Sequence, residues 1–174
     1  HARILIDDTP VHCLVVHLGL FGGGRSRQIA ALVERIKRLV PADEPILIAG
    51  DFNDWNNRLA PLFVEQLGLF EVFAVAPQDP AGPLNLRSSV RQLGRSLRGM
   101  ARPTVLSRSV HELGINGAAR MTPPPRTFPA VFPWLRLDRI YQRGFAVRRA
   151  RVLQGLPWKQ LSDHAPIFAE LELP

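Results

Sequence analysis

The sequence Gly-Asp-Phe-Asn at positions 50–53 combines residue types that suggest chemistry, and it directly follows a short apolar run that predicts a buried strand. In α/β sheets, ligands bind beyond the carboxyl ends of the strands. In extended backbone, Asp51 and Asn53 point the same way while Phe52 points into the core. A carboxylate beside an amide oxygen suits a hard cation such as Mg²⁺. The alternative is a polar turn before a helix, in which Asp54 would serve as the N-cap.

A second polar motif, Ser-Asp-His at positions 162–164, comes just before the last predicted strand. The carboxylate of Asp163 is a candidate metal ligand. The imidazole of His164 is a candidate base, because it titrates near neutral pH. The alternative for this motif is a polar turn with a surface histidine.

Two further residues lie on predicted strands. Asp138 shares a strand face with Ile140, and a carboxylate on a face built for burial needs a partner. An arginine partner would make a structural ion pair, whereas a histidine partner would make an oriented base. His17 shares a face with Cys13 and Val15, and a core histidine with satisfied hydrogen bonds is the commoner explanation for such a residue.

The elements that must position these residues alternate between strand and helix. Strand, helix and strand in succession indicate an α/β fold. The apolar periodicities predict a hairpin over 3–6 and 11–18, a helix over 26–40 with Ser26 as N-cap, a strand over 45–49, a helix over 59–67, an apolar run over 69–76, and strands over 135–141, 145–152 and 165–173.

The composition narrows the class of protein. With 174 residues, 46% of them hydrophobic, the chain is long and apolar enough to fold around a core and is not a disordered polypeptide. The single cysteine excludes an internal disulfide and fits a reducing compartment. No charged and then apolar leader opens the sequence. These features predict a cytoplasmic protein, with a membrane-peripheral location as the alternative.

The net charge of +7 is concentrated between Asn85 and Arg120, a window that contains seven arginines and only one acidic residue, Glu112. Arg91 and Arg95 belong to this window and are candidate substrate-binding residues, because a local basic patch suits a phosphate-bearing partner. As a helix, the window would lie on anionic lipid or follow the phosphates of a nucleic acid. The alternative is a solvated insertion that packs its apolar stripe onto the domain.

Taken in order, the motifs resemble the endonuclease/exonuclease/phosphatase superfamily of Mg²⁺-dependent phosphodiesterases. The resemblance runs from residue 11 to the C-terminus, apart from the basic window, and segments 16–20, 50–55 and 126–129 are similar to a bacterial branch of metal-dependent hydrolases within it. It implies an α/β (α+β) fold, a deoxyribonuclease-I-like β-sandwich flanked by helices. It also implies one domain over residues 1–174 with a basic insertion at about 78–125.

The resemblance also implies the cofactor and its ligands. Asp51 and Asn53 would orient the attacking water and the scissile phosphate and would hold a metal ion. Asp163 would be a carboxylate on the metal side. The implied metal is Mg²⁺, with Mn²⁺ as the alternative.

The same resemblance assigns the acid–base residues. His164, held by Asp138, would contact the phosphate or act as general base. His17 would neutralise the phosphoryl oxygens or protonate the leaving group. Arg126, on the loop before the Asp138 strand, would contact the substrate, which is expected to be a nucleic acid or a phospholipid head group.

The family pattern begins earlier than this chain, with strands that carry an Asn and a Glu, and the Glu is the principal Mg²⁺ ligand. Nothing before Val11 matches them. We therefore expect the C-terminal portion of a domain, namely the last hairpin of its first sheet and all of its second sheet, without the N-terminal strands. The missing N-terminal segment would be its partner. Such a chain should hydrolyse phosphodiesters weakly and form homo-oligomers through exposed apolar surface.

A second class of function competes with the enzyme. It is a catalytically silent module that binds nucleic acid or anionic membrane through the arginine-rich window. The set of acidic, amide and histidine side chains favours the enzyme, because a pure binding module has no need of them.

Overall fold

The computed structural model describes residues 1–77 and 123–174, and its strands lie in two sheets. The strands are β1 (Ala2–Ile6), β2 (Thr9–His17), β3 (Ile46–Asp51), β4 (Phe70–Glu71), β5 (Asp138–Arg143), β6 (Ala146–Val152) and β7 (Ile167–Glu172). The larger sheet has the order β1-β2-β3-β5-β4, and β6 pairs with β7 in the smaller one. β2 and β3 are parallel, and the other pairs are antiparallel.

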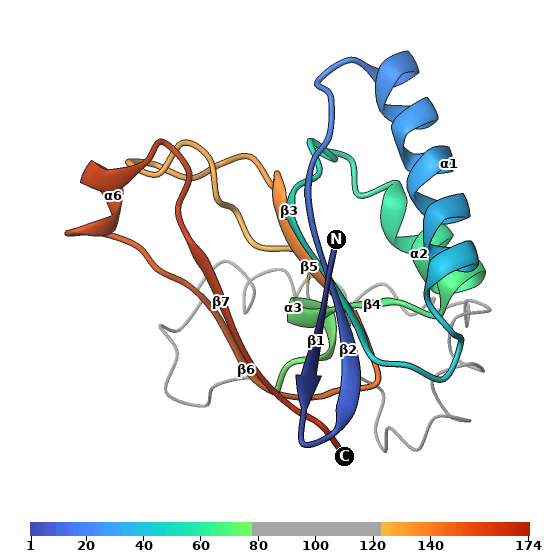
Figure 1. Ribbon diagram of the computed structural model, residues 1–174. Helices are drawn as coiled ribbons and strands as arrows, with labels where there is room; N and C mark the ends of the chain where they lie inside the picture. Colours follow the sequence, from blue (N-terminus) through green and yellow to red (C-terminus); the bar gives the residue numbers. More distant parts are fainter. Residues whose placement is uncertain (78–122) are drawn as a thin grey trace, which may run out of the picture. The chain divides into compact units, whose positions relative to one another are not determined.

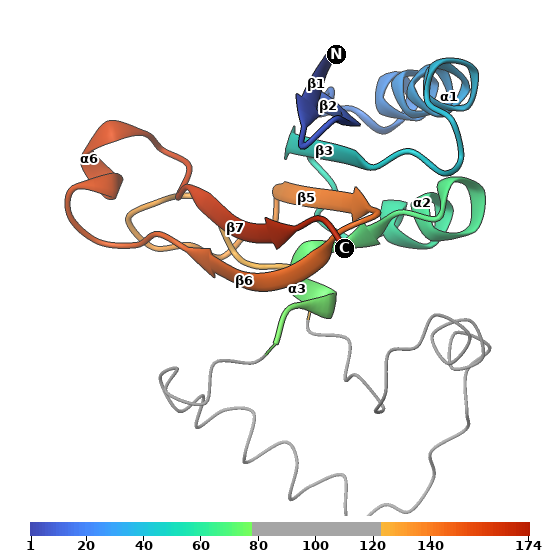
Figure 2. The same ribbon diagram turned by 60° about the horizontal axis from the view of Figure 1, so that its bottom comes forward.

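Helices cover one face of the larger sheet. They are α1 (Gly22–Leu39) and α2 (Leu59–Leu67), with two short helices elsewhere, α3 (Val72–Val75) and α6 (Trp158–Leu161). Figure 2 shows α1 and α2 on one side of the five-stranded sheet and the β6–β7 pair on the other. This layering confirms the α/β, deoxyribonuclease-I-like architecture that the motif order implies.

The connection from β2 through α1 to β3 places His17 beside the Gly-Asp-Phe-Asn motif (Figure 1). Parallel neighbours need a crossover, and α1 supplies it. Its apolar residues Ile29, Val33 and Ile36 recur at helical spacing and are buried. Because the crossover returns the chain parallel to β2, the ends of β2 and β3 lie at the same edge of the sheet.

Phe52 of the Gly-Asp-Phe-Asn motif lies in the core between the helices and the larger sheet. Phe52 is fully buried and makes edge-to-face contacts with Phe63 and Tyr141, at ring-centroid distances of 5.9 and 5.2 Å. Such aromatic pairs are worth about 1 kcal/mol each beyond the area that they bury. The predicted inward orientation of Phe52 is therefore confirmed, and it fixes the backbone between Asp51 and Asn53.

Two expectations about the elements are wrong. The hairpin of β1 and β2 does not belong to a separate sheet, because β2 pairs directly with β3. Helix α1 begins at Gly22 rather than at Ser26, whose hydroxyl donates to the carbonyl of Gly22 inside the first turn. The three glycines at positions 22–24 therefore form the first turn of the helix.

Two sequence-based interpretations concern membranes and the basic window. Within residues 1–77 and 123–174, none of the helices combines the length and the apolar composition that crossing a bilayer needs. Arg91 and Arg95 lie outside the described residues, as does the rest of the arginine-rich window.

Candidate active site

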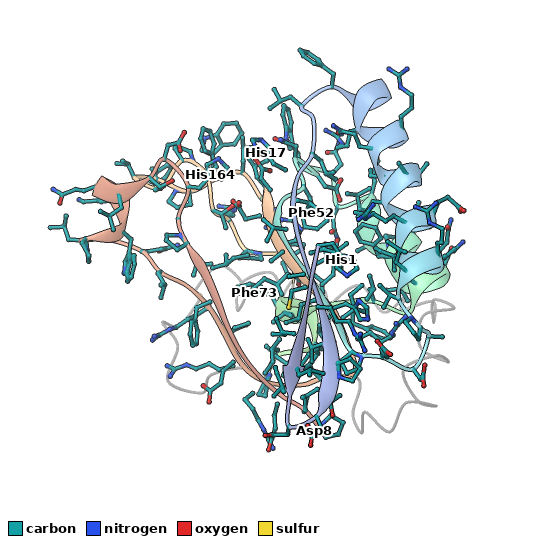
Figure 3. The ribbon with its side chains drawn as sticks, viewed as in Figure 1. His1, Asp8, His17, Phe52, Phe73 and His164 are labelled. Carbon is teal, nitrogen blue, oxygen red and sulfur yellow. The ribbon has the colours of Figure 1, made fainter. Side chains whose placement is uncertain are left out.

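Three strands bring predicted site residues into one row. His17 at the end of β2 pairs in register with Asp51 at the end of β3, and Asp51 pairs with Asp138 at the start of β5. Figure 3 shows His17 and His164 at this same end of the sheet. The structure therefore gathers residues that are more than a hundred positions apart in the sequence.

The turn after β3 orients the carboxylate of Asp51. Its Oδ1 accepts a hydrogen bond from the backbone N–H of Asn53 at 2.8 Å, and its Oδ2 lies 3.7 Å from Nε2 of His17. Asn53 has positive φ, which Asn tolerates better than most residues, and its Nδ2 donates to the carbonyl of Leu18 at 2.8 Å. The Oδ1 of Asn53 is buried without a hydrogen-bond partner in the described residues.

The polar-turn alternative holds in part: the N-cap residue of α2 is Arg58 rather than Asp54, but the Asp54 carboxylate binds backbone N–H groups at the start of this helix. Asp54 is buried and accepts hydrogen bonds from the backbone N–H groups of Arg58 and Leu59, at 3.0 and 2.9 Å, where α2 begins. Capping of this kind contributes about 1 kcal/mol. Since Asp54 satisfies the helix, Asp51 and Asn53 are left for the site.

His164 and Asp138 form a hydrogen-bonded pair, with 2.8 Å between Nδ1 and Oδ2. The partner of the Asp138 carboxylate is thus the histidine rather than an arginine. Partial burial of His164 disfavours its charged form, but the hydrogen bond to Asp138 and the charges of Asp138, Asp51 and Asp163 outweigh it. The net effect is a raised pKa of His164. With Nδ1 bound to the carboxylate, Nε2 is the nitrogen that remains for a substrate or a water.

The segment around Thr127 holds this pair in place. The backbone N–H of Ala165 donates to the carbonyl of Thr127 at 2.7 Å, and the N–H of Asp138 donates to Thr127 Oγ1 at 3.3 Å. The ring of Phe128 packs on the imidazole of His164, with 5.0 Å between centroids. Fully buried Thr127 therefore joins β5, which begins at Asp138, to the segment before β7 that carries His164, a role that a lone threonine in the sequence did not indicate.

Arg139 is a second residue that sequence reasoning missed. Its side chain is fully buried next to Asp138, and it donates from Nη1 to the carbonyl of Asp138 at 2.9 Å and from Nη2 to the carbonyl of Asp54 at 3.0 Å. It thereby ties the strand that carries Asp138 to the loop that follows Asp51. The only signal in the sequence was an arginine within a strand built for burial.

Glu71 lies buried near this arginine, and its Oε2 accepts a hydrogen bond from the N–H of Ala74 at 2.9 Å. Burial raises the pKa of Glu71 to about 7, although the charge of Arg139 and the backbone hydrogen bonds act in the opposite direction. The carboxyl group is thus protonated in the folded protein over a pH range in which it is ionised in the unfolded chain.

Replacing Glu71 with glutamine is expected to flatten the pH dependence of stability. In the wild type, the folded state holds a proton that the unfolded state releases between pH 4.5 and about 7, so stability falls as the pH rises through this range. The loss is about 3 kcal/mol. Urea denaturation of the wild type and of Glu71→Gln at pH 4.5 and at about pH 7 measures the change in the free energy of unfolding. An equal change with pH in the two proteins would contradict the buried, protonated state of Glu71.

The remaining predicted residues are placed differently. Asp163 has an exposed side chain, and its carbonyl accepts from the N–H of Ala130 at 2.6 Å. Arg126 is exposed on the segment before β5. The side chain of His17 is 80% exposed, which contradicts the alternative of a satisfied core histidine. The roles assigned to Asp163 and Arg126 stay predictions.

A sheet whose strand ends gather histidines, carboxylates and an amide has the arrangement implied for the deoxyribonuclease-I-like class. Residues 2–164 match the model of the Endonuclease/Exonuclease/phosphatase family, and the chain belongs to this family. Membership supports a hydrolase of the phosphatase or nuclease type in general.

Individual proteins with a similar sequence or structure are about twice as long as this chain. The chain is 34% identical over 163 residues to the uncharacterized protein YbhP of Escherichia coli K12, covering 94% of this chain and 47% of YbhP. The chain thus spans about half the length of the curated relatives that it matches. A functionally unknown conserved protein from Enterococcus faecalis V583 has a similar structure, with a TM-score of 0.60 and 19% identity over 95% of this chain and 51% of that one.

A mannosyl-6-phosphatase of Bacteroides thetaiotaomicron, Bt3783, is a further structural neighbour, with a TM-score of 0.59 and 18% identity over 96% of this chain and 53% of that one. At this level of identity the likeness shows the fold alone.

Proposed function

We propose that this chain carries the acid–base residues of a metal-dependent phosphodiester hydrolase. The observation that supports this most directly is the contact of 2.8 Å between Nδ1 of His164 and Oδ2 of Asp138. The pair lies at the sheet end where His17 faces Asp51. An imidazole oriented by a carboxylate is the usual form of a general base.

The proposed reaction is attack of water on phosphorus. Nε2 of neutral His164 accepts a proton from the attacking water, and Asp138 stabilises the imidazolium that forms. The bond between phosphorus and the leaving oxygen breaks, and His17 gives that oxygen a proton. His17 and His164 thus exchange protons with opposite sides of the phosphate, while Asn53 keeps the carboxylate of Asp51 in place.

We propose that Asp51, Asn53 and Asp163 hold the metal, Mg²⁺ or alternatively Mn²⁺. The unpartnered Oδ1 of Asn53 and the Oδ2 of Asp51 are hard oxygens on one turn, which fit such an ion. In residues 1–77 and 123–174 no three acidic, histidine or cysteine side chains form a closed metal site. Mg²⁺ often keeps several waters and uses one or two carboxylates. When bound, it neutralises phosphate charge and lowers the pKa of water.

The proposal is tested with a soluble diester, bis-nitrophenyl phosphate, and with the matching monoester. The assay uses the protein at its full natural length, because this chain spans about half of its curated relatives. Hydrolysis of the diester is expected with Mg²⁺ or Mn²⁺ and is expected to stop when the metal is removed with EDTA. Turnover that is insensitive to EDTA, or turnover of the monoester alone, would overturn the proposal.

The competing function, a silent binding module, depends on the arginine-rich window. That window lies outside the described residues, and the residues that are described supply an oriented base instead. The enzyme is therefore the function that the site supports best.

A further inference from the structure

Large apolar side chains are exposed where the strands that carry the site end. In the described part of the chain, eight of the fourteen exposed large apolar residues lie on four connections next to site residues. We call these eight side chains the apolar rim: Leu20, Phe21, Trp55, Val131, Phe132, Trp134, Leu156 and Leu161. Scattered exposed apolar residues are ordinary, but a concentration of them marks an interaction surface.

The apolar rim lies on the connections that flank the proposed catalytic residues in the sequence. Phe21 lies four positions after His17, at the end of β2, and Trp134 lies four positions before Asp138, at the start of β5. Leu161 lies three positions before His164. Figure 1 shows the connections after β2 and β3 and the one that contains α6 at the upper end of the view. Figure 3 shows His17 and His164 at that end. A surface that binds the apolar rim would therefore lie at the end of the sheet that carries the site.

The connections hold the apolar rim in a defined position. Nη1 of Arg25 donates to the carbonyl of Leu20 at 3.0 Å, and the backbone N–H of Trp134 donates to the carbonyl of Phe128 at 2.9 Å. Ordered loops lose little conformational entropy on binding, so their exposed side chains contribute more of their burial energy to affinity.

The charge next to the apolar rim is positive. Arg58, Arg126 and Lys159 are exposed on the same connections. Asp163 is the one exposed acid on those connections among the described residues. A surface that is both apolar and basic is complementary to one that is apolar and negatively charged.

We infer from the apolar rim that the substrate is a phospholipid, taken from an anionic bilayer on which this face of the protein lies. This inference rests on the proposed function. Half of the rim is aliphatic, including Leu20, Val131 and Leu161, and such side chains enter acyl chains but do not stack on bases. Trp55 and Trp134 have the amphipathic rings that prefer a membrane interface. The head-group phosphodiester then meets the two histidines.

The test is binding to vesicles of phosphatidylcholine with and without phosphatidylglycerol. Trp55 and Trp134 report directly, because their emission should shift to shorter wavelength and be quenched by brominated lipid. Binding is expected to be stronger with phosphatidylglycerol and to weaken with salt. The combined variant Phe21→Ser, Phe132→Ser and Leu161→Ser is expected to bind about a hundredfold more weakly.

The matched control replaces apolar residues that are equally exposed elsewhere. Leu5 on β1 and Val15 on β2 are 70% and 87% exposed, against 83% for Phe21. The variant Leu5→Ser with Val15→Ser should bind vesicles as the wild type does. Circular dichroism checks that both variants fold. Equal loss of binding in the control would overturn the inference.

Other outcomes assign the apolar rim to another partner. The inference of a phospholipid substrate would be overturned if the rim variant lost affinity for a single-stranded oligonucleotide but not for vesicles. It would also be overturned if sedimentation showed a dimer that the same substitutions dissociate. Binding to vesicles is measured without turnover. Hydrolysis of the soluble diester without vesicle binding would therefore overturn the inference alone, and vesicle binding without hydrolysis would overturn the proposed function alone.

Discussion

Replacing His164 with alanine is expected to lower kcat for hydrolysis of the soluble diester by about a thousandfold. In the proposed reaction, the substitution removes the nitrogen that would accept the proton of the attacking water. It also leaves the carboxylate of Asp138 without its partner at 2.8 Å. His164 is about a quarter exposed, so the fold should tolerate its loss. Steady-state kinetics at saturating metal measure the effect, with circular dichroism as the check on folding.

The chain contains a matched control for this substitution. His12 also pairs with a carboxylate, Glu44, at 2.5 Å, but it lies at the start of the β2–β3 pairing, away from the site. His12→Gln removes a comparable pair and should leave kcat within a few-fold of the wild type while lowering stability. If His12→Gln and His164→Ala lost activity equally, the result would contradict a specific role of the His164–Asp138 pair in the reaction.

Replacing Asp138 with asparagine tests the electrostatic part of the same pair. Partial burial disfavours the imidazolium, and the carboxylates, with Asp138 first among them, reverse this and raise the pKa of His164. Without the carboxylate, that pKa should fall, and the acidic limb of the pH–rate profile should move to lower pH. NMR titration of His164 in metal-free protein measures the shift directly. An unchanged pKa would show that Asp138 does not tune the base.

The sequence predicted those site residues whose chemistry is unusual for their position. Asp51 and Asn53 after a buried strand, and Asp138 on a buried face, each break the apolar pattern of a strand. Such local conflicts between polarity and position are typical of functional sites. The structure brings these residues and His164 to one end of the sheet.

The residues that support the site were not predictable in the same way. Thr127 and Arg139 act through backbone carbonyls and N–H groups of segments that are distant in the sequence. A threonine or an arginine at another position of these segments would look the same in the sequence, because residue type alone does not show which distant backbone groups a side chain binds. Their roles depend on which segments are neighbours, and that is decided by sheet order rather than by residue type.

The same reason explains the errors about the elements. Strand periodicity shows which side of a strand is apolar, but it does not show which strand lies beside it. The hairpin of β1 and β2 was therefore assigned to another sheet, although β2 pairs with β3 along its length. That pairing is what sets His17 beside Asp51.

Gly50 makes this pairing possible, and its replacement by alanine is expected to have the largest effect on stability. Gly50 has a φ of +143°, a conformation that L residues rarely adopt, and it pairs with Val16. A Cβ atom added there would lie 1.9 Å from the carbonyl oxygen of Val16, so the two strands would have to separate. We expect a loss of about 3 kcal/mol or more in the free energy of unfolding, measured by urea denaturation.

Activity should fall as well, because the displaced residue immediately precedes Asp51. A displacement of about 1 Å at a reacting group costs about a hundredfold in rate. Gly22→Ala is the control, since nothing lies within 4 Å of an added Cβ there and the residue begins α1. It should be neutral or slightly stabilising. A Gly50→Ala protein with wild-type stability would show that β2 and β3 do not pair in this register. The glycine of the motif is thus required by the close approach of two strands, and the position of the Asp51 carboxylate depends on it.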